Sequence, residues 1–149
     1  MLKKLISVLA LTIGLSSVFA TTGDKAEAAY YHTKAISVAK ANLGVPYRWG
    51  GITPSGFDCS GLVKYSFAKA GKVLPRTAAD MFYTKGYRVS YLQPGDLLFY
   101  APTKASRPTH VAMYLGAGKM IMASSSKGVI VTYTSNTYWK PKYIGAKRI

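Results

Sequence analysis

Three kinds of residue are scarce in this sequence, and each scarcity narrows the chemistry that the chain can support. The sequence has one cysteine, two histidines and five acidic residues. A lone cysteine cannot form an internal disulfide, so Cys59 is either a small buried side chain or a reactive thiol. One cysteine, two histidines and widely separated aspartates do not supply the ligand sets of zinc or calcium sites. We therefore expect no metal and no cofactor.

The N-terminus has the pattern of a secretory signal. Two lysines precede an uncharged apolar run over residues 5–20, which is short for a membrane-spanning helix. Small residues up to Ala28 then provide a cleavage site. We predict a signal peptide over residues 1–28 and a single domain over residues 29–149, with an uncleaved membrane anchor as the alternative. No second apolar run of spanning length follows, so we expect no stable membrane insertion.

Positive charge dominates the composition. Twenty lysines and arginines against five acidic residues give a net charge of +15. Removal of residues 1–28 takes away three lysines and two acids, which leaves +14. Such an excess predicts an anionic partner or surface. Nucleic acid is one such partner, but the export signal and the absence of a basic helix or nucleic-acid motif argue against it.

The order of the predicted elements indicates an α+β domain. Apolar periodicity predicts one helix over residues 33–43, with Thr33 as its cap, and a second over residues 59–70, with Asp58 as its N-cap. The Gly- and Pro-rich residues between them are expected to form a loop. Short apolar runs then predict consecutive antiparallel strands, so helices should pack on one face of a meandering sheet. The strands are expected at residues 96–100, 110–115, 120–123, 129–133 and 143–148.

Cys59 lies where the predicted loop enters the second helix. The dipole and the unpaired amides of a helix N-terminus favour thiolate, so we expect a lowered thiol pKa. The same amides are placed to hold an oxyanion. A cysteine nucleophile also needs a base. His32 lies in a polar segment where we expect an exposed side chain, whereas His110 opens an apolar strand, as either a base or a structural histidine at a sheet edge.

Five motifs in a fixed order give the chain a resemblance to the NlpC/P60 peptidases. The resemblance extends from about residue 33 to the C-terminus and implies a papain-like α+β core. It also implies hydrolysis of amide bonds in peptidoglycan stem peptides, usually the bond between the D-glutamate side-chain carboxyl and the diamino acid. The five motifs are GVPYRWGG at 44–51, GFDCSGLV at 56–63, LPRT at 74–77, LQPGDLLF at 92–99 and HVAMYLG at 110–116.

The resemblance also implies a function for individual residues. Cys59 corresponds to the family's nucleophile and His110 to its general base and acid. Tyr47, Asp58 and Ser60 correspond to residues that line the site and help hold the substrate. The plainer alternatives are a packed loop aromatic at Tyr47 and a simple helix cap at Asp58, and the cap is compatible with the functional role.

One position departs from the family pattern. Members usually have a polar residue 12 positions after the histidine, and here that position is Met122. A thioether is a poor hydrogen-bond acceptor, so either Cys59 and His110 act as a dyad or another group orients the ring. If residues 116–118 form a three-residue hairpin loop, Ser124 lies opposite His110 and is a candidate for that group, directly or through water.

The sequence therefore predicts a secreted cysteine endopeptidase that acts on peptidoglycan. Anionic wall polymers are the partner that its positive charge implies at the cell wall. Two alternatives remain open, namely a wall-binding protein that has lost catalysis and a thiol amidase or acyltransferase of the same fold.

Overall fold

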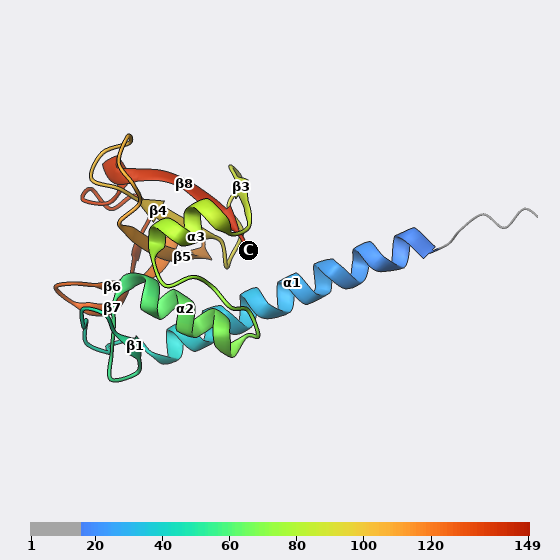
Figure 1. The fold of residues 1–149 in the computed structure, drawn as a ribbon, viewed down its shortest axis with the longest axis horizontal. Helices are drawn as coiled ribbons and strands as arrows, with labels where there is room; N and C mark the ends of the chain where they lie inside the picture. The colour runs from blue at the N-terminus through green and yellow to red at the C-terminus, as the bar shows by residue number, and fades with distance from the viewer. Residues whose placement is uncertain (1–15) are drawn as a thin grey trace, which may run out of the picture.

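The first helix is much longer than the sequence pattern predicts. The computed structural model describes residues 16–149, and most of the predicted apolar run of the signal peptide lies outside these residues. Helix α1 (Ser16–Ala41) extends away from the rest of the molecule at its N-terminal end (Figure 1). The prediction that Thr33 caps this helix is wrong, because residues 24–32 contain good helix formers and no proline. Cleavage after Ala28, which falls within α1, stays a prediction.

Two shorter helices follow. Helix α2 (Cys59–Lys69) agrees with the prediction, and the Asp58 carboxylate caps it by accepting the Gly61 N–H at 2.7 Å. Helix α3 (Ala78–Thr84) was not expected. The hydroxyl of Thr77 caps it by accepting the Asp80 N–H at 3.1 Å. No helix within residues 16–149 combines the length and apolar character that crossing a membrane requires.

Six strands form one antiparallel sheet in the order β3-β8-β4-β5-β6-β7. The five predicted strands are confirmed, and β4 to β7 form the expected meander. The last strand does not continue that meander, because it crosses back to pair with β4 and β3. A small separate hairpin, β1 (Ile52–Thr53) and β2 (Gly56–Phe57), lies within the predicted loop. The strands of the large sheet are β3 (Tyr87–Val89), β4 (Leu97–Tyr100), β5 (His110–Gly116), β6 (Lys119–Ser124), β7 (Gly128–Tyr133) and β8 (Tyr143–Arg148).

The sheet separates two apolar layers. Helices α1 and α2 pack on one face, where Phe67 of α2 is fully buried against residues such as Val111 and Ile121 of the strands. On the opposite face, Tyr100 and Met122 pack beneath the segment that joins β7 to β8. Full burial of one large apolar side chain contributes roughly 1.5–3 kcal/mol, so the layers together hold α2 firmly against β5 and β6. The predicted α+β architecture is confirmed.

His32 is a structural residue of the helical layer. Its side chain is buried rather than exposed, which corrects the sequence-based expectation. Its Nε2 lies 3.1 Å from the carbonyl oxygen of Ile149, and the Tyr31 hydroxyl donates to the same oxygen at 2.7 Å. Burial lowers the pKa of His32, so the ring stays neutral at neutral pH. The prediction of an exposed His32 fails because the long helix α1 places this residue against the C-terminal end of β8.

A buried ion pair joins the start of β4 to the end of β8. Asp96 is fully buried, and it fixes the preceding turn by accepting the Gln93 N–H at 2.7 Å. Arg148 donates to both carboxylate oxygens of Asp96 at 2.8 Å. Removing one partner of such a pair leaves an uncompensated buried charge, which is far more costly than losing an exposed contact.

We predict that Arg148→Met lowers the free energy of unfolding by about 3–5 kcal/mol, because the Asp96 carboxylate would remain buried without its cation. Lys140→Met is the matched control, since it removes one positive charge from an exposed side chain and should change stability by less than about 0.5 kcal/mol. Urea unfolding followed by circular dichroism measures both. Equal effects of the two substitutions would show that the buried pair contributes nothing special.

Candidate active site

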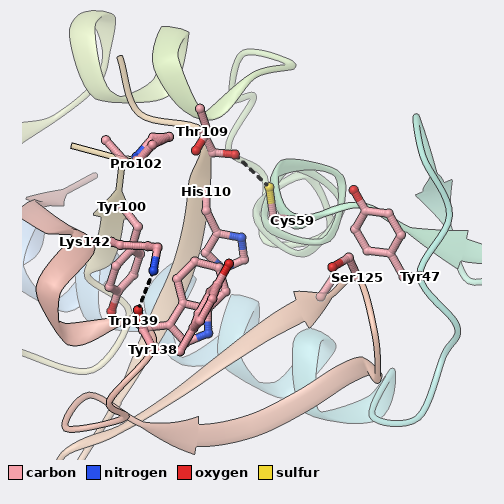
Figure 2. Close-up of a pocket in the computed structure, with 12 residues that line it drawn as sticks. Tyr47, Cys59, Tyr100, Pro102, Thr109, His110, Ser125, Tyr138, Trp139 and Lys142 are labelled. Carbon is pink, nitrogen blue, oxygen red and sulfur yellow. Dashed lines mark hydrogen bonds between the residues drawn. The ribbon is translucent and has the colours of Figure 1, made fainter. Parts of the chain in front are cut away.

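Cys59 is the first residue of α2 and lies beside the start of β5. Its thiol donates to the carbonyl oxygen of Thr109, with the sulfur 3.8 Å from that oxygen (Figure 2). Thr109 directly precedes His110, so this contact brings the helix start and the strand start together. A Cβ at Gly61 would overlap the carbonyl oxygen of Gly51, so only glycine lets the first turn of α2 approach the preceding loop this closely.

His110 faces the same cavity as Cys59. Figure 2 shows its imidazole between the indole of Trp139 and the thiol, with a ring nitrogen on the side of the sulfur. The side chain is 9% exposed, and Tyr100 packs against it with 5.8 Å between ring centroids. Its Nε2 atom is buried and has no hydrogen-bond partner among the described residues. The thiol and imidazole that the sequence singles out are therefore brought together.

Burial controls the charge of both groups. It raises the pKa of the Cys59 thiol, although the backbone N–H groups of Val111 and Ser60 act in the opposite direction. The expectation of a lowered thiol pKa is therefore wrong for the free protein, because desolvation outweighs the favourable amides. Burial also lowers the pKa of His110 to about 4. At neutral pH the free protein holds a neutral thiol beside a neutral imidazole.

Two cavities meet at the sulfur. One has a volume of about 310 Å³ and the other about 470 Å³. Tyr47, Cys59 and Thr109 line both, so the thiol lies in the middle of a continuous groove. The smaller cavity is also lined by His110, Ser125, Tyr138, Trp139 and Lys142, and the larger one by Trp49, Asp58, Ser60, Arg76 and Pro108.

Asp58 organises the larger cavity. Its carboxylate accepts the Gly50 N–H at 3.2 Å, in addition to the cap bond with α2. Arg76 donates to both oxygens of Asp58 and also to the Ser60 hydroxyl, at 2.9 Å. The carboxylate in turn raises the pKa of Arg76. Tyr47, Asp58 and Ser60 thus lie together as expected, although the carboxylate oxygens already accept several bonds.

The sequence motifs predict no function for Arg76, although the motif LPRT at 74–77 contains it. The composition of the sequence indicates that Asp58 needs a positively charged partner. Asp58 is one of only five acidic residues, and a carboxylate that caps a buried helix start needs a cation to compensate its charge. Of the basic residues, Arg76 follows α2 by a short segment and can reach back to that helix start. Its planar guanidinium then bonds both carboxylate oxygens at once.

The structure does not bring Ser124 to the imidazole. Tyr114 lies opposite Met120, and this register, continued along the strands, puts Ser124 opposite His110 as expected. The side chain is engaged elsewhere, because the Ser124 hydroxyl hydrogen-bonds that of Ser126 at 3.3 Å. Met122, at the position of the family's usual polar residue, is fully buried in the second apolar layer. Within the described residues, Ser124 makes no hydrogen bond to His110, and the Nε2 atom of His110 has no partner.

Lys142 carries the charge of the smaller cavity. Its ammonium donates to the Tyr138 carbonyl oxygen at 3.0 Å and lies 3.7 Å from the centroid of the Tyr138 ring. It forms no ion pair within the part of the chain that the structure describes. The same part of the chain contains no cluster of three histidine, cysteine or acidic side chains that could hold a metal ion. The chemistry of the groove is that of a thiol and an imidazole.

Comparison with known proteins agrees with this arrangement. Gamma-DL-glutamyl hydrolase of Bacillus subtilis is 42% identical over 134 residues, which cover 87% of this chain and 32% of that protein. Murein DD-endopeptidase MepH of Escherichia coli is 39% identical over 113 residues, which cover 72% of this chain and 42% of that protein. The chain thus spans less than half the length of these relatives.

A solved structure supports the same relationship over more of its length. The peptidoglycan hydrolase RipB of Mycobacterium tuberculosis superposes with a TM-score of 0.71 at 34% identity, covering 92% of this chain and 73% of that chain. The model of the NlpC/P60 family matches residues 44–148, which include every residue of the groove. On these grounds the chain belongs to the NlpC/P60 family.

Proposed function

We propose that the protein is a secreted cell-wall hydrolase that cleaves peptidoglycan stem peptides with Cys59 as nucleophile and His110 as general base and acid. The observation that carries the proposal is the shared cavity, in which the chain's lone thiol faces a buried imidazole at the middle of a groove. Membership of the NlpC/P60 family supports it, as do relatives named as a murein endopeptidase and a peptidoglycan hydrolase.

The neutral resting pair suits this chemistry. His110 takes the proton of Cys59 as the sulfur attacks the amide carbonyl, so charge separates only when substrate is present. The backbone N–H groups at the start of α2 are oriented toward the oxyanion that forms. The imidazolium then protonates the leaving amine, and the acyl group stays on the sulfur. In the second half, His110 deprotonates a water that releases the acid and regenerates the thiol.

The proposed bond joins the side-chain carboxyl of D-glutamate to the diamino acid. The names of the two curated relatives refer to different bonds, a gamma-glutamyl bond in one and a DD bond in the other. The gamma-glutamyl relative has the higher identity to this chain and favours the bond usual in the family. The larger cavity, with Asp58, Ser60 and Arg76, is proposed to hold the peptide on the acyl side of this bond, since Tyr47 and Cys59 connect it to the thiol.

We predict that Cys59→Ala and His110→Ala each abolish cleavage of muropeptides while the fold is retained, because both side chains line the groove and neither is among the buried apolar residues of the two layers. His110→Ala should also raise the pH at which iodoacetamide alkylates Cys59, since the thiol loses its proton acceptor. Activity assays and alkylation profiles measure these effects, with Ser124→Ala as the control that should leave both unchanged. Full activity of Cys59→Ala would rule out the nucleophile assignment.

Product analysis tests the bond itself. Digestion of purified muropeptides should yield fragments that end at D-glutamate and fragments with a free amine on the diamino acid, identified by mass spectrometry. Release of intact stem peptides would instead indicate a thiol amidase, whereas transfer of the acyl group to an added amine would indicate an acyltransferase. No product from intact walls or soluble muropeptides, with tight binding to walls, would indicate a binding protein without catalysis.

We also propose that removal of residues 1–28 releases the protein and that its charge attaches it to anionic wall polymers. Among the described residues only Arg76 and Arg148 form ion pairs, so the lysines are free to act together on an external anion. Nine of the lysines in the predicted domain are exposed or partly exposed outside the groove and make no hydrogen bond through the ammonium group. They are Lys34, Lys40, Lys69, Lys72, Lys85, Lys104, Lys119, Lys127 and Lys140.

We predict that adsorption to intact walls falls steeply between 0.1 M and 1 M salt, because the screening length shortens from about 10 Å to about 3 Å. Cleavage of a small soluble muropeptide should change far less, since it depends on the groove alone. Cosedimentation with walls and a parallel peptide assay measure the two responses. Equal adsorption at low salt to walls with and without teichoic acids would show that the charge has another purpose.

A further inference from the structure

The imidazole of His110 lies flat against the indole of Trp139. The two ring centroids are 4.0 Å apart and the planes differ by 18°, which is a stacked arrangement. Tyr100 closes another side of the imidazole and also contacts Trp139 edge-on, with 5.3 Å between ring centroids. The remaining open side of His110 faces Cys59 in the cavity (Figure 2). Aromatic surfaces therefore confine the ring.

Among the described residues, no polar side chain holds the His110 ring in place by a hydrogen bond to Nε2. Met122 occupies the position where the family usually has a hydrogen-bonding residue, and Ser124 bonds Ser126. The Nε2 atom of His110 accordingly has no partner in residues 16–149. A general base still needs a fixed position relative to the proton that it abstracts, and a small displacement can cost about 100-fold in rate. Within the described residues, packing against Trp139 and Tyr100 is what constrains the ring.

The backbone of Trp139 is hydrogen-bonded within the segment that connects β7 to β8. The side-chain oxygen of Asn136 accepts the backbone N–H groups of Tyr138 and Trp139 at 2.9 and 3.2 Å. The Trp139 carbonyl oxygen accepts the Lys142 N–H at 2.9 Å. Asn136 does not line the cavity, so it acts on the indole without touching the groove. These bonds fix the backbone of Trp139 at the position from which its indole stacks on His110.

We propose that Trp139 is the positioning residue of this site, which holds His110 against Cys59 by stacking rather than by a hydrogen bond from a polar side chain. The proposal rests on the proposed function, in which His110 is the base. Stacking fixes the plane of the ring and excludes water from one face, but leaves the choice of tautomer free. The site therefore runs as a thiol–imidazole dyad supported by an aromatic surface.

Exchange of the indole tests the proposal. Trp139→Ala should lower kcat for a soluble muropeptide by about 10- to 100-fold, because the imidazole loses its fixed position. The acidic limb of kcat/KM should move to higher pH, since water reaches the ring and the pKa of His110 rises from about 4 toward its ordinary value. The titratable groups that share the cavity with His110 are Cys59, Lys142 and three tyrosines, and none of them is changed by the substitution. The tyrosines are Tyr47, Tyr100 and Tyr138. Trp139→Phe should restore most of kcat and keep the acidic limb in place, because it retains a stacking face.

A second variant acts from outside the groove. Asn136→Ala should reproduce the shift of the acidic limb without a rise in KM, whereas Asn136→Asp should keep the wild-type profile, because its carboxylate oxygen still accepts the two N–H groups. Circular dichroism and thermal melting establish that each variant is folded. An unchanged pH profile and kcat in folded Trp139→Ala, with only a raised KM, would overturn the proposal and leave Trp139 as a groove wall.

Alkylation of Cys59 separates this proposal from the proposed function, since it needs no substrate. The pH profile of iodoacetamide alkylation in Trp139→Ala should move toward that of His110→Ala, because loosening the ring uncouples it from the thiol. This result supports the positioning role even if no muropeptide is cleaved. A Trp139→Ala profile identical to the wild type, with His110→Ala clearly different, would show that the imidazole keeps its place without the indole and would overturn the proposal.

Discussion

The site depends on the hydrogen bonds that the carboxylate of Asp58 accepts. It caps α2, anchors the loop before β1 through Gly50 and holds Arg76 from the segment before α3. Three separate stretches of chain therefore converge on one buried charge. Cys59 follows Asp58 directly, so the same contacts fix the sulfur relative to both cavities. A helix cap by itself would contribute about 1 kcal/mol to stability. Here the same carboxylate also holds the segments that line the groove.

Burial gives the site its electrostatic character. Exposed thiols at helix termini gain thiolate character from the local amides, but here desolvation of Cys59 has the larger effect. The same desolvation keeps His110 neutral far into the acidic range. The two shifts act in the same sense, since both disfavour the ion pair in the free protein. Charge is then created inside the groove only during attack, where preorganised amides stabilise it most effectively.

The sequence was sufficient for the elements that combine a clear period with a clear boundary. Helix α2 has Asp58 as its cap and Gly71 as its stop, and strands β5 to β7 are apolar runs separated by glycines. Thr33 misled because a good cap residue can also lie inside a helix when its neighbours favour helix. The short helix α3 has too few residues to show a period. The return of β8 to β4 reflects long-range pairing, which local patterns do not encode.

The same limits apply to the site. The motif around Cys59 and the strand of His110 predicted which two side chains meet. The partners that hold them could not be predicted, because Arg76 and Trp139 reach the site through tertiary packing rather than through spacing along the chain. The sequence around an aromatic residue in a turn does not indicate which side chain that residue will contact. Met122 showed that a usual partner is missing, but not what replaces it.

The division of charges within the fold has a further consequence. The two buried carboxylates, Asp58 and Asp96, are each matched by an arginine, and the exposed lysines take no part in either pair. The two arginines therefore stabilise the fold and the site, whereas the exposed lysines determine the electrostatic potential around the molecule. The two sets can vary independently, so the surface of this domain can be adapted to a different polymer without any change in the groove.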